Sequence, residues 1–434
     1  MGGFQIFLVN RKGFILLLPY FTEQDDTLIR QGAVRDYLGL QSVWSSVARQ
    51  LEPNLSGQVT NIQGIKAVGL IYHIMNNNRN FDDKMEKNSR LFFRYMEGLF
   101  EYYLVHEMNE KPCYGARAIN GDKLSLKINL NAGTVVMGLY QYYRGTCRRA
   151  GIINDDWTLD NKLESIYKAL IPQDIEIKKL MDSFKGLMKK DDKTFSPFEI
   201  MKDKDINSLF NSVFGGSDSS ISKYLDGVFY KDLNLRMYAS SCSEVIYSEN
   251  ALGSKAFQVH QKLLSQPTDY PRLDSMQHFL DCEPFLCLLN DLFHSLLNAG
   301  TLKAFGESAV IQEEAVTERA RAFIRLEQVN NTEFSSARFK ELYQLAHIII
   351  DKQWDIFAET LFQYHEQLML VRKQGPVAMI DNGKVESLQD IGRYENEQIL
   401  DRIKNQHIWN NGYYIYSTAS IYSQIQKELE GTVS

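Results

Sequence analysis

The chain has 434 residues, of which 44% are hydrophobic and 24% charged, a balance typical of a globular protein with two or three domains. Its formal net charge of −6 excludes a protein that coats nucleic acid over its whole surface, although it leaves room for a local basic patch. Nine prolines are few for this length, which favours long helices, and five scattered cysteines favour a reducing compartment.

The first 200 residues predict a helical domain with short strands. Residues 4–18 are typical of one or two strands around a turn. Apolar residues at helical spacing then predict further helices, which cover 25–51, 61–75, about 88–102, 134–151 and about 155–171. Alternating apolar residues over 123–131, after the turn pair Asn120-Gly121, predict a hairpin.

The pattern loosens after residue 181, and we place a domain boundary between residues 182 and 220. Gly215 to Ser220 is rich in glycine and serine and is typical of a flexible loop. The predicted domains are therefore 1–200 and 221–434. The second is expected to contain short helices, a helix closed by Gly300, a small hairpin around Asp381-Asn382-Gly383, and helices near the C-terminus.

Residues 339–371 carry the clearest helical pattern of the chain. Apolar side chains recur at alternating steps of four and three residues, which is a heptad seam: Phe339, Tyr343, Ala346, Ile350, Trp354, Phe357, Leu361, Tyr364, Leu368 and Val371. The pattern predicts one continuous helix that ends with Gly375 in a left-handed cap, followed by Pro376. Such a helix is either the core helix of a domain or a docking surface for a second chain.

Short catalytic signatures are missing from the sequence. It contains no HExxH zinc motif, Walker A loop, dinucleotide fingerprint or GxSxG elbow. Cys282 and Cys287 lie five residues apart, which favours buried thiols over a zinc site, and we expect neither a metal nor a cofactor. The apolar runs of residues 4–18 are too short to span a bilayer and lack the features of a signal peptide, so we expect a cytoplasmic protein without membrane contact.

The densest cationic group combines three arginines with two lysines of the predicted hairpin and two tyrosines: Arg144, Arg148, Arg149, Lys123, Lys127, Tyr142 and Tyr143. Arginines next to aromatic rings suit phosphate contact and base stacking, so these five cations are a candidate nucleic-acid-binding site. The alternative is a solvated helix end whose cations complement the helix dipole and pair with Asp155 and Asp156.

Arg402 and His407, separated by four residues on a predicted helix, resemble the ribonuclease motif of the HEPN families. That resemblance implies that His407 is a general acid or base on a ribose hydroxyl and that Arg402 stabilises phosphate charge. A surface arginine and an interface or core histidine produce the same spacing by chance, so both interpretations stay open.

Two further stretches resemble a known class of proteins: LGLQSVWSSVARQLEPNLSGQVTNIQGIKAVGLIYHI over residues 38–74 and LYQYYRGTCRRAGII over residues 139–153. Together they are similar to uncharacterised helical accessory proteins encoded in bacterial phage-defence and DNA-modification-dependent restriction loci. The similarity covers about an eighth of the chain and includes no diagnostic catalytic residue. It implies a non-motor subunit that works beside an ATPase or a nuclease.

We therefore expect a mainly α-helical, two-domain protein with small β-hairpins. Its expected function is that of a non-catalytic scaffold or adaptor subunit in a multiprotein bacterial assembly for anti-phage defence, in contact with DNA through the Arg144 cluster. The alternative function is a HEPN-like ribonuclease that uses Arg402 and His407.

Overall fold

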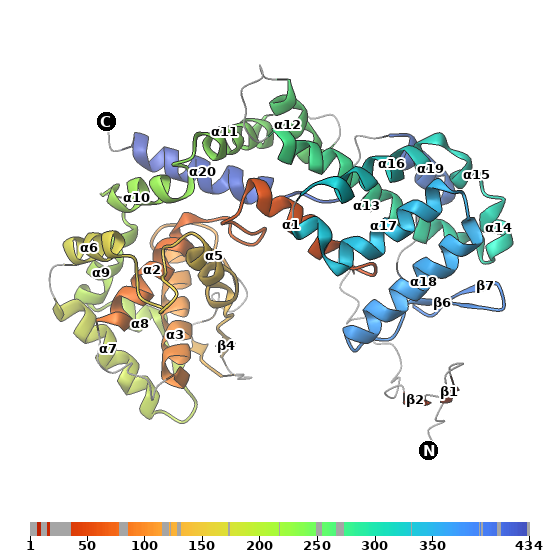
Figure 1. The fold of residues 1–434 in the computed structure, drawn as a ribbon. Coiled ribbons are helices and arrows are strands. Elements are labelled where there is room, and N and C mark those ends of the chain that lie inside the picture. Colours follow the sequence, from red (N-terminus) through yellow and green to blue (C-terminus); the bar gives the residue numbers. More distant parts are fainter. Residues whose placement is uncertain are drawn as a thin grey trace. The chain divides into compact units, whose positions relative to one another are not determined.

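The computed structural model is mainly α-helical with small sheets of two or three strands, which confirms the predicted fold class (Figure 1). The residues that the structure describes are 7–9, 15–17, 36–77, 86–114, 121, 123–127, 132–171, 174–216, 218–248, 254–265, 273–330, 332–389, 391, 394–405 and 409–431. Only the backbone is described for 7–9 and 15–17, which form the antiparallel strands β1 (Phe7–Val9) and β2 (Ile15–Leu17).

The chain divides into two compact units, each built from two separate stretches of sequence. Unit 1 comprises Met1–Val47 and Gln277–Asn411, and unit 2 comprises Ala48–Met276 and Gly412–Ser434. This division differs from the predicted domains 1–200 and 221–434. The glycine-rich segment in the predicted boundary region joins α9 (Lys204–Phe214) to α10 (Ser220–Phe229), and both helices belong to unit 2.

Unit 2 is organised around α2 (Ile62–Asn76), which is buried along almost its entire length. The helices around it include α3 (Glu86–His106), α5 (Arg144–Arg149), α6 (Asn161–Leu170), α9 and α20 (Ile415–Glu430). The rest of the unit contains α7 (Asp174–Lys189), α8 (Pro197–Met201), α10, α11 (Leu233–Tyr247) and α12 (Lys255–Leu264). The predicted helix over 61–75 is confirmed, with Asn61 as its N-cap.

Two glycines of α2 let large rings approach its backbone. A Cβ atom on Gly64 would lie 2.5 Å from the Tyr143 ring, and one on Gly69 would lie 2.6 Å from the Tyr167 hydroxyl. That hydroxyl donates to the Lys66 carbonyl over 2.7 Å. The Lys66 ammonium is 2.8 Å from the Glu428 carboxylate, which ties the C-terminal helix α20 to α2. A buried lysine requires such a partner, because an isolated charge is costly in the core.

The predicted hairpin over 123–131 is wrong in the part that the structure describes. Strand β3 (Leu124–Ser125) pairs in parallel with β4 (Gly133–Thr134) and antiparallel with β5 (Thr194–Phe195). Ser125, which the alternating pattern placed on the solvent face, is fully buried between Leu124 and Leu126. The pattern failed because β3 lies in the middle of its sheet, where both faces can be covered.

Unit 1 is built on α13 (Leu273–Ala299), α14 (Leu302–Gly306), α15 (Ala309–Gln312), α16 (Glu314–Ile324), α17 (Ala337–Ile350), α18 (Trp354–Val371) and α19 (Asn396–Lys404). The 3-10 turns η5 (Arg325–Gln328) and η6 (Thr332–Ser335) connect α16 to α17. The predicted hairpin is confirmed as β6 (Ala378–Asp381) and β7 (Lys384–Ser387), with Asn382 and Gly383 at positive φ.

Helix α18 holds the early segment of unit 1 in place. The Tyr364 hydroxyl donates to the Leu38 carbonyl over 2.6 Å, and His365 Nδ1 lies 2.9 Å from the Tyr37 carbonyl. The other ring nitrogen of His365 accepts the Val377 N–H over 3.0 Å, and burial lowers the pKa of this histidine. A neutral imidazole with one donor and one acceptor satisfies both contacts.

The single helix predicted over 339–371 is wrong, because the chain breaks between α17 and α18. Lys352 has φ +55°, and its N–H donates to the Ile349 carbonyl over 3.0 Å. The Gln353 N–H donates to the Ile348 carbonyl over 3.1 Å, which completes a Schellman cap. A second cap of this kind, with Lys373 at φ +56°, ends α18 before the predicted stop at Gly375.

Two other predicted helices begin later than expected. The helix predicted over 25–51 starts at α1 (Leu40–Leu51), where the Asp36 carboxylate accepts the Leu40 N–H over 2.7 Å, and residues 25–35 lie outside the described residues. The helix predicted from Asp155 starts at α6, with Asp160 as its N-cap. In both places an aspartate caps the first turn, which is what decides where a helix begins.

Candidate nucleic-acid interface

The predicted basic cluster lies on a continuous helical run formed by the π-helix η4 (Leu139–Tyr143) and α5. Leu139, Tyr143 and Cys147 form the buried face of this run. A π-helical turn holds an extra residue and shifts the angular positions of the side chains around it. Interruptions of this kind are frequent at functional sites, because they direct selected side chains away from the regular helical pattern.

Arg144 lies against two aromatic rings. Its guanidinium carbon lies 3.8 Å from the centre of the Tyr140 ring and 4.7 Å from the centre of a Trp157 ring. Arg148 lies 4.5 Å from Trp157, and Arg90 of α3 lies 5.5 Å from Tyr140. Each such contact is worth about 0.5–2 kcal/mol, so together they fix three positive charges beside one another. We call these five residues the arginine–aromatic cluster.

Trp157 reaches this cluster because the chain turns sharply before α6. Its φ of +66° lies in the left-handed region, which bulky residues rarely adopt. Within the turn the Trp157 N–H donates to the Asn154 carbonyl over 3.0 Å, and the Thr158 hydroxyl donates to Asp156 over 2.6 Å. The indole stacks on Tyr72 of α2 with ring centres 6.4 Å apart. Backbone strain of this kind concentrates at functional sites.

The alternative interpretation, a solvated helix end, predicted that the arginines pair with Asp155 and Asp156. The structure contains the pair with Asp155. Arg148 Nη2 lies 3.1 Å from Asp155 Oδ1, and the Asp155 side chain is 98% exposed. An exposed pair is worth less than about 1 kcal/mol, so a phosphate group can displace this carboxylate. Asp156 is bound to Thr158 instead, and that hydrogen bond lowers the pKa of Asp156.

Arg149 differs from the other two arginines of the predicted site. Its Nη2 donates to the Asn54 carbonyl over 3.1 Å and to the Thr146 hydroxyl over 3.2 Å. Burial lowers the pKa of this guanidinium, which is partly enclosed by the segment before α2. The Nη2 group of Arg149 is therefore bound to the protein, while the side chain as a whole is exposed, so its place in the predicted site stays a prediction.

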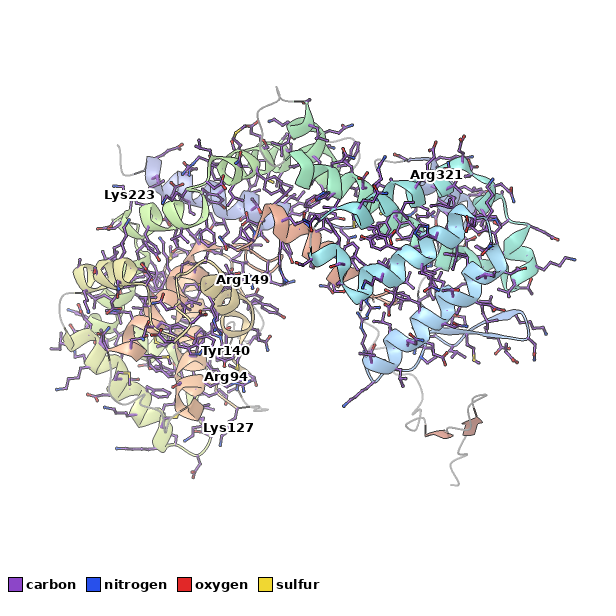
Figure 2. The ribbon with its side chains drawn as sticks, in the orientation of Figure 1. Arg94, Lys127, Tyr140, Arg149, Lys223 and Arg321 are labelled. Atoms are coloured by element: carbon purple, nitrogen blue, oxygen red, sulfur yellow. The ribbon has the colours of Figure 1, made fainter. Side chains whose placement is uncertain are left out.

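The two predicted lysines flank strand β3. Lys123 and Lys127 are both exposed, and Lys127 Nζ donates to the Asp191 carbonyl over 3.4 Å. In the view of Figure 2, the labelled residues Arg149, Tyr140, Arg94 and Lys127 follow one another down unit 2. Arg94 links this row to the sheet, because its guanidinium donates to the carbonyl of Leu126.

Sequence reasoning missed three members of the arginine–aromatic cluster. Tyr140 stands four residues before Arg144, and that helical spacing could have identified it as a neighbour. Arg90 and Trp157 come from α3 and from the turn before α6, so only the tertiary structure brings them to Arg144. Conversely, Tyr143 lies in the core rather than beside the arginines at the surface.

Two buried carboxyl groups of α3 lie beneath this surface. Glu97 accepts the Leu139 N–H over 3.0 Å at the start of η4, and Glu101 accepts the N–H groups of Cys113 and Tyr114 over 2.7 and 3.0 Å. Burial raises the pKa of each carboxyl to about 8. Both are therefore mostly protonated at neutral pH, and they do not offset the positive charges above them.

Arg402 occupies a buried network of unit 1. Its Nε donates to Asp291 over 2.8 Å, its Nη2 donates to Asn410 over 2.8 Å, and its guanidinium lies 4.8 Å from the Tyr394 ring. Burial raises the pKa of Asp291, and its second carboxylate oxygen has no hydrogen-bond partner among the described residues. His407 lies outside the described residues, so the geometry of the HEPN-like pair stays a prediction.

The rest of this network fixes the segment after α19. Glu283 of α13 accepts the N–H groups of Asn410 and Asn411 over 2.8 and 3.0 Å, and the Cys287 thiol donates to Glu283 over 3.2 Å. Arg319 of α16 donates to the carbonyl groups at the end of α19. These polar groups bind one another, which is the expected arrangement of a structural core network.

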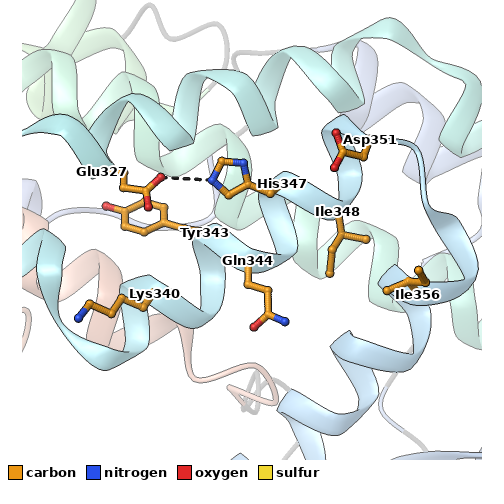
Figure 3. Close-up of a pocket in the computed structure, with 8 residues that line it drawn as sticks. All are labelled: Glu327, Lys340, Tyr343, Gln344, His347, Ile348, Asp351 and Ile356. Carbon is orange, nitrogen blue, oxygen red and sulfur yellow. Dashed lines mark hydrogen bonds and ion pairs between the residues drawn. The ribbon is translucent and has the colours of Figure 1, made fainter.

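An open pocket of about 510 Å³ lies between η5, α17 and the start of α18 (Figure 3). It is lined by Glu327, Lys340, Tyr343, Gln344, His347, Ile348, Asp351 and Ile356. His347 Nε2 lies 3.2 Å from Glu327 Oε2, and both side chains are about half exposed. Water screens a contact at this exposure, so the pocket offers weaker electrostatics than a closed active site.

Within the described ranges, no group of three or more histidine, cysteine or acidic side chains is arranged to hold a metal ion. Among the helices that the structure describes, none combines the length and the apolar character that a bilayer crossing requires. No protein-family model matches the chain, and no curated protein or solved structure is significantly similar to it. A functional proposal for this chain must therefore start from its own residues.

Proposed function

We propose that the protein is a non-catalytic helical subunit that contacts the phosphate backbone of nucleic acid, with DNA as the expected ligand, through the arginine–aromatic cluster. The observation that carries this proposal is the placement of Arg144 between Tyr140 and Trp157. Ring faces hold the guanidinium in position, and a cation that is fixed in this way suits contact with an anion. The neutral carboxyls of Glu97 and Glu101 preserve the local positive potential.

At the rings of Tyr140 and Trp157, phosphate contact by the neighbouring arginines is better supported than base stacking. Both Tyr140 and Trp157 already have arginines against their rings, and Trp157 also stacks on Tyr72. Phosphate contact carries no sequence information by itself. The cluster therefore suits a protein that holds nucleic acid for a partner that reads or cuts it.

The assembly role stays a proposal drawn from the sequence resemblance, with an ATPase or a nuclease as the expected protein partner and anti-phage defence as the setting. The seam of residues 339–371 no longer supports it, because most of that seam packs inside unit 1. The ribonuclease alternative has no supporting observation among the described residues, since Arg402 is bound to Asp291 and Asn410.

The test is charge reversal within the cluster. In Arg144→Glu/Arg148→Glu we expect the affinity for a fluorescein-labelled DNA oligonucleotide to fall at least tenfold in anisotropy titrations at 50 mM salt. The slope of log affinity against log salt should fall by about 2, since two phosphate contacts are lost.

The matched control is Lys223→Glu/Arg321→Glu, which makes the same change in net charge at two exposed positions elsewhere on the chain (Figure 2). We expect this control to bind DNA within about threefold of the wild type. Equal losses in both double variants would show that net charge alone governs binding. DNA binding that is absent in the wild type would overturn the proposed function.

A further inference from the structure

The helical run of η4 and α5 presents two chemically different flanks beside its buried face. Tyr140 and Arg144 are four residues apart and share one flank, where their side chains touch. Tyr142 stands two residues from each of them, so it points to the opposite flank. The two flanks therefore offer cations on one side and an aromatic ring on the other.

Tyr142 has the geometry of a stacking platform. Its side chain is 39% exposed, and its ring lies against Tyr114 with centres 5.4 Å apart and planes 29° from parallel. Tyr114 is itself anchored, because its hydroxyl donates to the Gln58 carbonyl over 2.6 Å and its ring packs edge-on against Tyr143. Tyr114 therefore supports one side of the Tyr142 ring, and the 39% of the Tyr142 side chain that is exposed is the part available to a ligand.

The ridge between the two flanks carries a glycine among longer side chains. Gly145 lies there and has no side chain, and a Cβ atom at this position would meet the Arg149 guanidinium only at 3.4 Å, which is an ordinary contact. The backbone of a helix has a radius of about 2.3 Å, whereas its side chains extend the diameter to about 10 Å. An extended chain can therefore cross at Gly145 more closely than at a residue with a side chain.

We infer that the protein binds single-stranded nucleic acid across the η4–α5 helix, with phosphate groups on Arg144 and Arg148 and a base stacked on Tyr142. This inference rests on the proposed nucleic-acid contact and names its ligand class. The bases of a duplex are paired and stacked within the helix, so an exposed ring gains nothing from them. A single strand presents phosphates and open base faces together, and each stacked base contributes about 1–3 kcal/mol.

The test compares three labelled probes, a thymidine 15-mer, a uridine 15-mer and a 15-base-pair DNA duplex, in anisotropy titrations at 50 and 200 mM salt. We expect either single strand to bind at least tenfold more tightly than the duplex. Tyr142→Ala should weaken single-strand binding by about 5- to 50-fold and leave duplex binding unchanged. Tyr142→Phe, which keeps the ring, should restore single-strand binding.

Two control variants test whether the effects depend on where the tyrosine and the glycine lie in the structure. Tyr247→Ala removes an exposed tyrosine of α11, and we expect it to bind all probes as the wild type does. Gly145→Leu places a side chain on the ridge and should weaken single-strand binding, whereas Gly186→Leu on α7, where an added Cβ has no neighbour within 4 Å, should not. Circular dichroism and thermal melting of each variant check that the fold is retained.

The outcomes separate this inference from the proposed function. Equal affinities for strands and duplex, with no effect of Tyr142→Ala, would remove the single-strand inference, while a loss in Arg144→Glu/Arg148→Glu would still support nucleic-acid contact. Absence of binding to every probe would remove both. Stronger binding of the thymidine strand identifies single-stranded DNA as the preferred ligand, and stronger binding of the uridine strand identifies RNA.

Discussion

Glu97 is an ionisable residue whose carboxyl group is buried in the core of unit 2. Its side chain is fully buried, and one carboxylate oxygen has no hydrogen-bond partner among the described residues. Burial raises its pKa from 4.5 to about 8 in the folded protein. Because the pKa is raised on folding, proton binding by Glu97 stabilises the folded protein fully below about pH 4.5. This stabilisation is lost as the pH rises through about 8.

We therefore expect Glu97→Gln to remove much of the fall in stability between pH 5 and pH 9. At pH 5 the variant and the wild type should unfold at similar urea concentrations, and at pH 9 the variant should be more stable by about 2 kcal/mol. Glu318→Gln, at an exposed position of α16, should leave the profile unchanged. Parallel profiles for the wild type and Glu97→Gln would contradict this account.

Arg402, the candidate phosphate-binding residue of the HEPN-like pair, forms a buried ion pair with Asp291. Its side chain is 15% exposed, while that of its partner Asp291 is 1% exposed. Removing one member of such a pair leaves the other charged and buried. We expect Arg402→Ala to lower the free energy of unfolding by about 3 kcal/mol, measured by urea denaturation.

The double variant Asp291→Ala/Arg402→Ala is the control for this prediction. Since it leaves neither charge unpaired, we expect it to lose less stability than the two single variants lose in sum. Unchanged stability of Arg402→Ala would show that the fold does not need this arginine, and the ribonuclease role would then regain support.

At the scale of the elements, the break between α17 and α18 is the main departure from the sequence pattern. The heptad seam continues on both sides of it, and Phe339, Tyr343, Phe357 and Leu361 are all buried. The spacing of apolar residues indicates which residues face the core. The cap at residues 351–353 interrupts the helix without changing that spacing. Periodicity therefore identified the buried face but not the end of the helix.

Lys352 provides the test of that break. A residue other than glycine in the left-handed region costs roughly 1 kcal/mol, so we expect Lys352→Gly to stabilise the protein by about 0.5–1 kcal/mol in urea denaturation. Lys340→Gly, inside α17, should instead destabilise it by about 1 kcal/mol. If both substitutions destabilise equally, Lys352 is helical and α17 runs on into α18.

At the scale of the whole molecule, the two units interleave along the chain. Unit 2 takes its last helix, α20, from the C-terminal end, and unit 1 takes the segment that contains Tyr37 and Leu38 from the start. A boundary drawn from a flexible loop cannot detect such exchange, because the loop composition says nothing about which distant helices pack together. The candidate interface and its aromatic supports all belong to unit 2.

The sequence by itself determined the helical class, most helix positions and the small hairpin around Asn382-Gly383. These features depend on neighbours within a few residues, where spacing, caps and turn residues act directly. Only the tertiary structure decided that β3 lies inside a sheet, that Arg149 donates to the Asn54 carbonyl, and that Arg90 and Trp157 join Arg144. Those outcomes depend on contacts between residues distant in the chain, which local patterns do not record.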